Sequence, residues 1–136
     1  MHIDKEHAEE CWISFILRLA MVTIFGVAAF SKFKMGLGVS SNYIVESFKA
    51  TWLPSWLVVP YAAVLPFVEA AITFWLLSGI KLREAWVFTA VVLISLAFGL
   101  MVTQQPMAAN VYMYVLLACT GLYFSRYDRC ALGCKK

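Results

Sequence analysis

Charged residues are scarce in this chain of 136 residues. They make up 14% of it, against about a quarter in an ordinary globular domain, whereas apolar residues make up 62%. The mean hydropathy is +0.79. The net charge of +3 is too small to indicate binding of nucleic acid. The composition predicts a small membrane protein with one domain over residues 1–136, in contact with the lipid bilayer.

Histidine is almost absent, and both histidines precede the first apolar stretch. A haem held by two histidines is therefore excluded, and a copper or di-iron site within the membrane lacks its ligands. Cys119 stands alone in an apolar stretch, as a small packing residue. We expect no cofactor on this chain. Two pairs of possible ligands, each spaced four residues apart, would nevertheless suffice for tetrahedral zinc at one membrane face; the alternative is free thiols. These residues are His7, Cys11, Cys130 and Cys134.

Long apolar stretches dominate what remains. Each is close to the ~20 residues that a helix needs to cross ~30 Å of hydrocarbon. Gln104, Gln105 and Pro106 separate the last two, because proline cannot continue the preceding helix. The chain is therefore predicted to be all-α, a polytopic bundle of four transmembrane helices. The predicted helices cover about residues 12–30, 57–77, 85–102 and 109–124.

The connection between the first two crossings is too long for a simple turn. Apolar and aromatic residues recur at helical spacing from Asn42 to Leu53, and Pro54 follows. This pattern predicts a short interfacial helix on the outer face. The helix would cap the bundle, or would form a docking surface or gate for a lipid-soluble ligand.

Lysine and arginine residues predict the orientation. Four crossings place both termini on one side, and that side carries the larger number of positive residues. The positive-inside rule then predicts cytoplasmic termini, in the cytoplasmic (inner) membrane of a prokaryote. Lys5, Lys81, Arg83, Arg126, Arg129, Lys135 and Lys136 lie on the predicted inner side, against Lys32, Lys34 and Lys49 on the outer side.

Arg18 and Glu69 each lie inside a predicted membrane helix. A charged side chain there costs about 2.5–3.5 kcal/mol on insertion scales, so it needs a partner or a wet cavity. Counted from the inner ends of their helices, the two residues lie at similar depths. We therefore predict an Arg18–Glu69 ion pair in the bundle interior. The pair would be an inert structural contact, a proton or quinone-headgroup site, or a contact completed by another subunit.

Three segments resemble the DoxX-like family of small four-helix membrane proteins. RLAMVTIFGVAAFSKF, from Arg18 to Phe33, is similar to the family's first helix, with an early arginine and a lysine just past its end. PFVEAAITFWLLSG, from Pro66 to Gly79, is similar to its second helix. SRYDRCALGC, from Ser125 to Cys134, resembles the segment that follows its fourth. The resemblance implies that Arg18, Lys32 and Glu69 match the family's polar positions.

The resemblance also implies a function. DoxX-like proteins are small membrane subunits associated with oxidoreductase complexes, including thiosulfate:quinone oxidoreductase. We therefore expect an accessory subunit, without intrinsic catalysis, that stabilises a larger membrane enzyme or lines a site open to quinone or lipid. Its partners would be larger membrane-protein subunits, and quinone would belong to the complex. The alternative is an independent small proton-coupled transporter that uses the buried Glu69.

Overall fold

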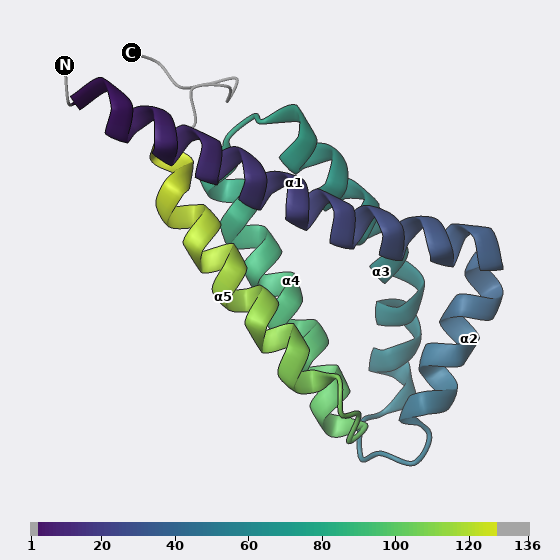
Figure 1. Ribbon diagram of the computed structural model, residues 1–136. Coiled ribbons are helices and arrows are strands. Elements are labelled where there is room, and N and C mark those ends of the chain that lie inside the picture. The colour runs from purple at the N-terminus through teal and green to yellow at the C-terminus, as the bar shows by residue number, and fades with distance from the viewer. Residues whose placement is uncertain (1–2, 128–136) are drawn as a thin grey trace.

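The computed structural model describes the backbone of residues 3–127 and the side chains of residues 9–126 (Figure 1). Within this part the chain forms five α-helices, a short terminal 3-10 helix and no β-strand, which confirms the all-α prediction. The helices are α1 (Ile3–Met35), α2 (Leu37–Phe48), α3 (Ser55–Ser78), α4 (Leu82–Val102) and α5 (Ala108–Phe124), followed by η1 (Ser125–Tyr127).

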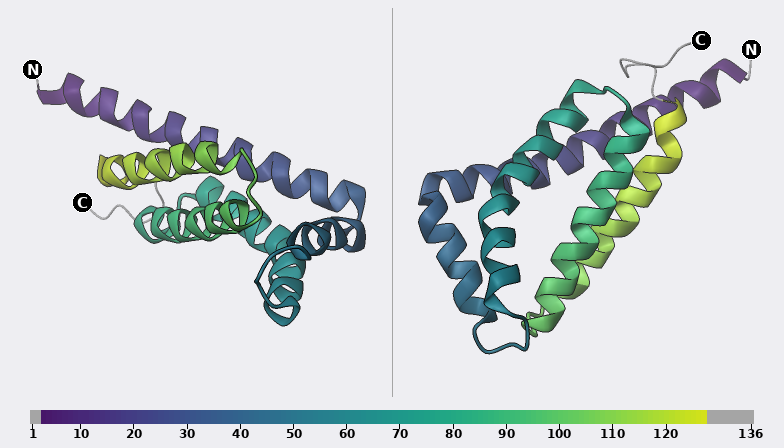
Figure 2. Two further views of the ribbon diagram at one scale, coloured as in Figure 1. Left: turned by 90° about the horizontal axis from the view of Figure 1, so that it is seen from below. Right: turned by 180° about the vertical axis from the view of Figure 1, so that it is seen from behind.

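Two helix pairs and one crossing helix make up the fold. α4 and α5 pack side by side, and α2 lies beside α3 (Figures 1 and 2). The long α1 crosses both pairs obliquely, packing mainly on α3 and also on α5. The beginning of α1, the α3–α4 connection and the end of α5 lie at one end of the molecule. The α2–α3 and α4–α5 connections lie at the other end, as expected for a chain that passes back and forth.

One face of α3 is buried along most of the helix, which places α3 in the middle of the fold. Its buried residues recur at alternating intervals of four and three, so they form one stripe along the helix. They are Val58, Ala62, Leu65, Glu69, Ile72 and Leu76, with the buried Pro66 next to Leu65 at the edge of the stripe. The other faces of α3 remain apolar but exposed; Phe74, for example, is 70% exposed. A helix that is hydrophobic all round, yet packed on only one side, is typical of a membrane span.

Three helices are long and apolar enough to cross a membrane: Glu9–Met35, Ser55–Ser78 and Leu82–Val102. This finding indicates an integral membrane protein. The fourth predicted crossing corresponds to the apolar α5, whose 17 residues extend about 25 Å. Four crossings therefore stay a prediction, of which length and composition support three.

The bounds predicted for the first two helices need correction. α1 runs over Ile3–Met35 instead of 12–30, because polar residues continue the helix beyond its apolar middle. α2 covers Leu37–Phe48 instead of 42–53. It begins after Gly36, whose φ of 92° breaks the chain direction in a conformation that favours glycine. Pro54 does not end α2; it precedes the first turn of α3, where its carbonyl accepts from Leu57. Whether α2 lies at a membrane interface stays a prediction.

Gly121 on α5 faces the indole of Trp86 on α4, a side chain with no exposed surface. A β-carbon at residue 121 would lie 2.5 Å from a ring atom of Trp86, closer than atoms in contact can approach. The buried indole ring of Trp86 is rigid, so it cannot move aside as the end of a flexible side chain could. The absence of a side chain at Gly121 therefore permits the close approach of α4 and α5.

We expect Gly121→Ala to lower the thermal stability of the purified protein in detergent. Overpacking of this kind costs about 1–3 kcal/mol. Gly38→Ala is the matched control, because a β-carbon on that α2 residue would meet no atom within 4 Å. The control should melt at the wild-type temperature or slightly above it. Equal melting temperatures for the two variants would contradict the packing described for Trp86.

Candidate functional site: a buried lysine–glutamate pair

Glu69 is the buried acid of the described chain. It lies on the stripe through which α3 packs against its neighbours, and only 2% of its surface is exposed. An isolated carboxylate at such a place would be costly, because the apolar surroundings solvate charge poorly. A cationic partner is therefore required if the carboxylate is ionised.

Lys32, near the end of α1, is that partner. Its Nζ lies 2.5 Å from Oε1 of Glu69 and donates a hydrogen bond to it. The lysine side chain keeps 20% of its surface exposed, so its stem is largely covered while the ammonium reaches inward. The pair joins two helices whose paired residues are 37 positions apart in sequence. It also neutralises the buried carboxylate of Glu69.

The predicted Arg18–Glu69 pair is not formed. Lys32 binds one oxygen of the Glu69 carboxylate, and the other, Oε2, has no hydrogen-bond partner. Arg18 precedes Lys32 by 14 residues, about 21 Å along α1. The guanidinium of Arg18, also buried, lies 5.9 Å from the ring centre of Phe15. The depth argument was wrong because α1 crosses α3 obliquely, so equal counts from two helix ends do not give equal heights.

The two carboxylate oxygens of Glu69 differ, because Oε1 binds Lys32 whereas Oε2 accepts no hydrogen bond within the described part of the chain. Oε2 is also buried. The backbone carbonyl of the same residue accepts from the Thr73 hydroxyl at 2.9 Å, so that polar group is satisfied. A carboxylate with one bound and one open oxygen can hold an ammonium ion firmly and can also accept a proton. The geometry thus permits a structural ion pair or a site of proton exchange.

The possible zinc ligands fall mostly outside the described side chains. These are His7, Cys130 and Cys134, so the predicted zinc site stays a prediction. Cys11 is half-buried and Cys119 is exposed, and both are free thiols. Among the residues that the structure describes, no group of three histidine, cysteine or acidic side chains is close enough to hold a metal ion.

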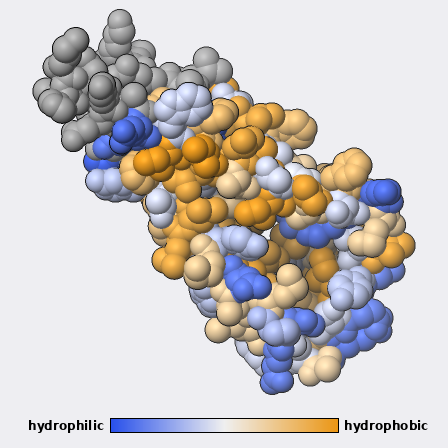
Figure 3. Space-filling model, viewed as in Figure 1, coloured by the Kyte–Doolittle hydropathy of each residue, from blue (hydrophilic) through white to orange (hydrophobic). Residues whose placement is uncertain are grey.

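A cleft between α2, α3 and α4 is a second candidate site. The sequence suggested a docking surface or gate at the segment that forms α2, but not the walls that α3 and α4 contribute. Figure 3 shows this face of the molecule hollowed between the two helix pairs. One cavity of about 220 Å³ lies toward the α4–α5 connection, and an adjoining one of about 500 Å³ lies between α3 and α4. Tyr61 lines both, and its hydroxyl lies 3.2 Å from that of Ser95 on α4. Gly99 on α4 leaves room there for the Phe48 ring.

We expect a double-mutant cycle to identify the pair. Lys32→Met leaves a buried unpaired carboxylate, which typically costs about 3–5 kcal/mol. Glu69→Leu should cost less, because the partly exposed Lys32 can turn its ammonium toward water. The double variant should recover most of the loss of Lys32→Met, as measured by thermal or denaturant unfolding in detergent.

Arg18→Met with Glu69→Leu is the control cycle. Residues far apart without a shared partner give additive effects within about 0.5 kcal/mol, so this cycle should show no coupling. Coupling of Glu69 to Arg18, with additive losses for Glu69 and Lys32, would overturn the assignment of the pair.

Comparisons of the chain with models of protein families, with curated proteins and with solved structures find no match. The resemblance to DoxX-like proteins therefore rests on the three segments of the sequence alone.

Proposed function

We propose that this protein is a small integral-membrane accessory subunit of a larger membrane oxidoreductase complex. The observation that carries the proposal is the compensated charge of Glu69. The acid is held by Lys32 across the α1–α3 contact, and such a contact fixes the arrangement of two helices. The polar positions of the DoxX-like resemblance include both residues of this pair. The chain would stabilise the larger complex and line a site open to lipid or quinone, without catalysis of its own.

Aromatic residues support a membrane position for α3. Trp56 is 74% exposed near one end of the helix, and Trp75 lies near the other. The two are 19 residues apart, about 28 Å along a helix, which matches the hydrocarbon thickness of about 30 Å. Tryptophan is enriched at both membrane interfaces. Glu69 lies six residues from Trp75, so its carboxylate would be about 9 Å inside the interface at the Lys81 end. The ammonium of Lys32, bound to that carboxylate, would then lie at the same depth and not on the outer side, where the residue count puts Lys32.

The alternative function is a proton-coupled transporter. The open oxygen Oε2 of Glu69 favours it, because a buried carboxylate that can take up a proton is the usual coupling element of such proteins. Lys32 weighs against it. A lysine that already holds the same carboxylate across the α1–α3 contact ties the acid to a structural role. The accessory role therefore fits the pair better.

We expect the protein, purified from its native membrane in a mild detergent through a tag after Lys136, to retain larger membrane subunits. Mass spectrometry of the co-migrating chains identifies them, and the untagged membrane processed in parallel is the control. Enrichment of an oxidoreductase subunit would support the accessory role. A strictly solitary protein, or one that drives proton-coupled efflux in sealed vesicles, would overturn it.

We also expect both termini to face the cytoplasm. Lys81 and Arg83 lie at the same end of the molecule as the start of α1 and the end of α5, which is where the positive-inside rule places the cytoplasm. Reporters fused after Lys81 and after Lys136 should be active on the cytoplasmic side. A reporter fused near Ser40 should be active outside. The opposite pattern would contradict the orientation.

A further inference from the structure

The cleft between α2, α3 and α4 is lined without a single charged side chain. Three adjoining cavities, of about 220, 500 and 390 Å³, meet at Tyr61. Their walls are mostly aliphatic and aromatic, and ligand sites for small molecules commonly measure about 300–1,000 Å³. A charged ligand would find no compensating group here, so the cleft suits an uncharged and mainly apolar molecule.

Most hydroxyl groups in the cleft already donate to partners. Ser95 donates to the carbonyl of Val92 at 2.7 Å, so the proton shared between Ser95 and Tyr61 must come from Tyr61. The Thr103 hydroxyl is directed at backbone carbonyls of its own helix, and so is that of Ser47. The deep part of the cleft therefore offers a ligand no free hydroxyl donor.

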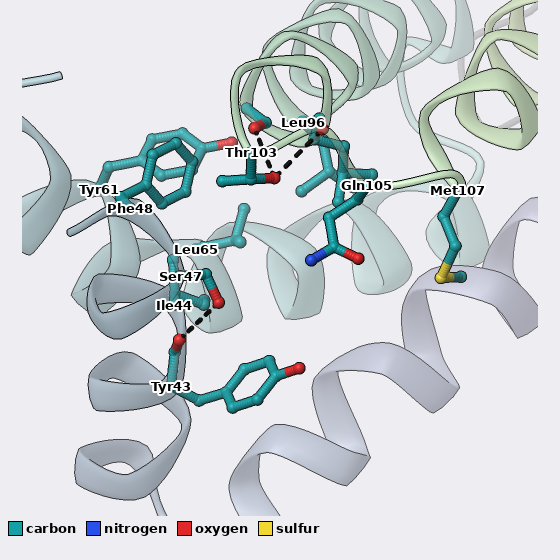
Figure 4. Close-up of a pocket in the computed structure, with 12 residues that line it drawn as sticks. Tyr43, Ile44, Ser47, Phe48, Tyr61, Leu65, Leu96, Thr103, Gln105 and Met107 are labelled. Atoms are coloured by element: carbon teal, nitrogen blue, oxygen red, sulfur yellow. Dashed lines mark hydrogen bonds between the residues drawn. The ribbon is translucent and has the colours of Figure 1, made fainter. Parts of the chain in front are cut away.

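Two polar groups at the mouth remain available. They are the phenol of Tyr43 on α2 and the carboxamide of Gln105 in the α4–α5 connection, and neither side chain has a hydrogen-bond partner within the described part of the chain. Figure 4 shows the two side chains reaching toward the same space from different elements. Both can donate to a carbonyl oxygen placed between them.

The length of the cleft fits a hydrocarbon chain. Its walls follow α3 from Leu57 to Val68, which is 11 residues or about 16 Å along the helix. One leaflet of a bilayer contributes about half of the ~30 Å of hydrocarbon. The cleft therefore extends about as far as one chain in one leaflet, with the donors of Tyr43 and Gln105 at one end.

We propose that this cleft binds one neutral lipid, with its acyl chain along α3 and α4 and its ester carbonyl between Tyr43 and Gln105. The absence of charge selects an uncharged head group, and the two donors fix the position of the carbonyl. This inference deepens the proposed function, since it names the ligand class of the lipid-accessible site. It concerns the chain by itself, so it stands apart from the question of which partner the protein joins.

The test uses the purified full chain in nanodiscs with a monoacylglycerol whose chain carries a photoreactive diazirine. Label should concentrate on cleft residues such as Leu57, Val91 and Phe98. Tyr43→Phe and Gln105→Leu should each lower the labelling of these residues about threefold to tenfold, the effect of one lost hydrogen bond. Tyr114→Phe is the matched control on α5, away from the cleft, and should leave the labelling unchanged.

A fatty acid with the same diazirine-bearing chain, used above the pH at which its head ionises, supplies the second arm. It should label the cleft at least tenfold less than the neutral probe. Equal labelling by the two probes would overturn the selection of a neutral head. Label spread over the exposed faces of α4 and α5, insensitive to Tyr43→Phe and Gln105→Leu, would overturn the site itself. Neither outcome bears on co-purification with partner subunits, so failure of this inference is distinguishable from failure of the proposed function.

Discussion

The ion pair between Lys32 and Glu69 is the constraint on which the rest of the structure depends. α1 crosses the other helices obliquely, and apolar packing alone would allow it to slide or rotate, because lipid is as apolar as the helix surface. The 2.5 Å contact fixes one point of α1 against one point of α3. α3 in turn carries α2 at its side, and the end of α1 sets the place where α2 begins.

Packing is tight where α4 meets α5 and open where α3 meets α4. Where α4 meets α5, the Trp86 ring fills the space that Gly121 leaves. Where α3 meets α4, the helices touch through fewer residues, and the Tyr61–Ser95 hydrogen bond joins them across the cleft. A protein that needed only rigidity would close this gap with larger side chains. The contrast between the two contacts underlies our proposal that the open side binds a lipid.

The sequence predicted the class of the protein and identified its buried polar residues, but it did not predict which of these residues pair with each other. Apolar length indicated the helices, and the rarity of charge singled out Arg18 and Glu69. Lys32 was identified through its place just past the first helix in the DoxX-like pattern, but its partner was not. Residue counts give positions along a helix, whereas pairing depends on the angle at which two helices cross. The cleft as a whole was not predicted for a related reason, because its walls come from three helices and only the α2 segment suggested a docking surface.

The proline and glycine residues between helices differ in how well they mark the helix ends. Pro54 does not end α2, because a proline serves equally well just before a helix, and it precedes α3 here. Gly36 was the better marker, since its positive φ makes the turn between α1 and α2. Helix propensity does not tell which of the two residues marks a helix end, because proline and glycine both interrupt helices.

The separation of the paired residues in sequence has a consequence for biosynthesis. Lys32 is made 37 residues before Glu69, which at 5–20 residues per second is a delay of about two to seven seconds. During that interval the lysine has no carboxylate to neutralise it, and its charge keeps the end of α1 near water. The contact that fixes α1 against α3 can therefore form only after α3 has been made, so the final position of α1 is set late in synthesis.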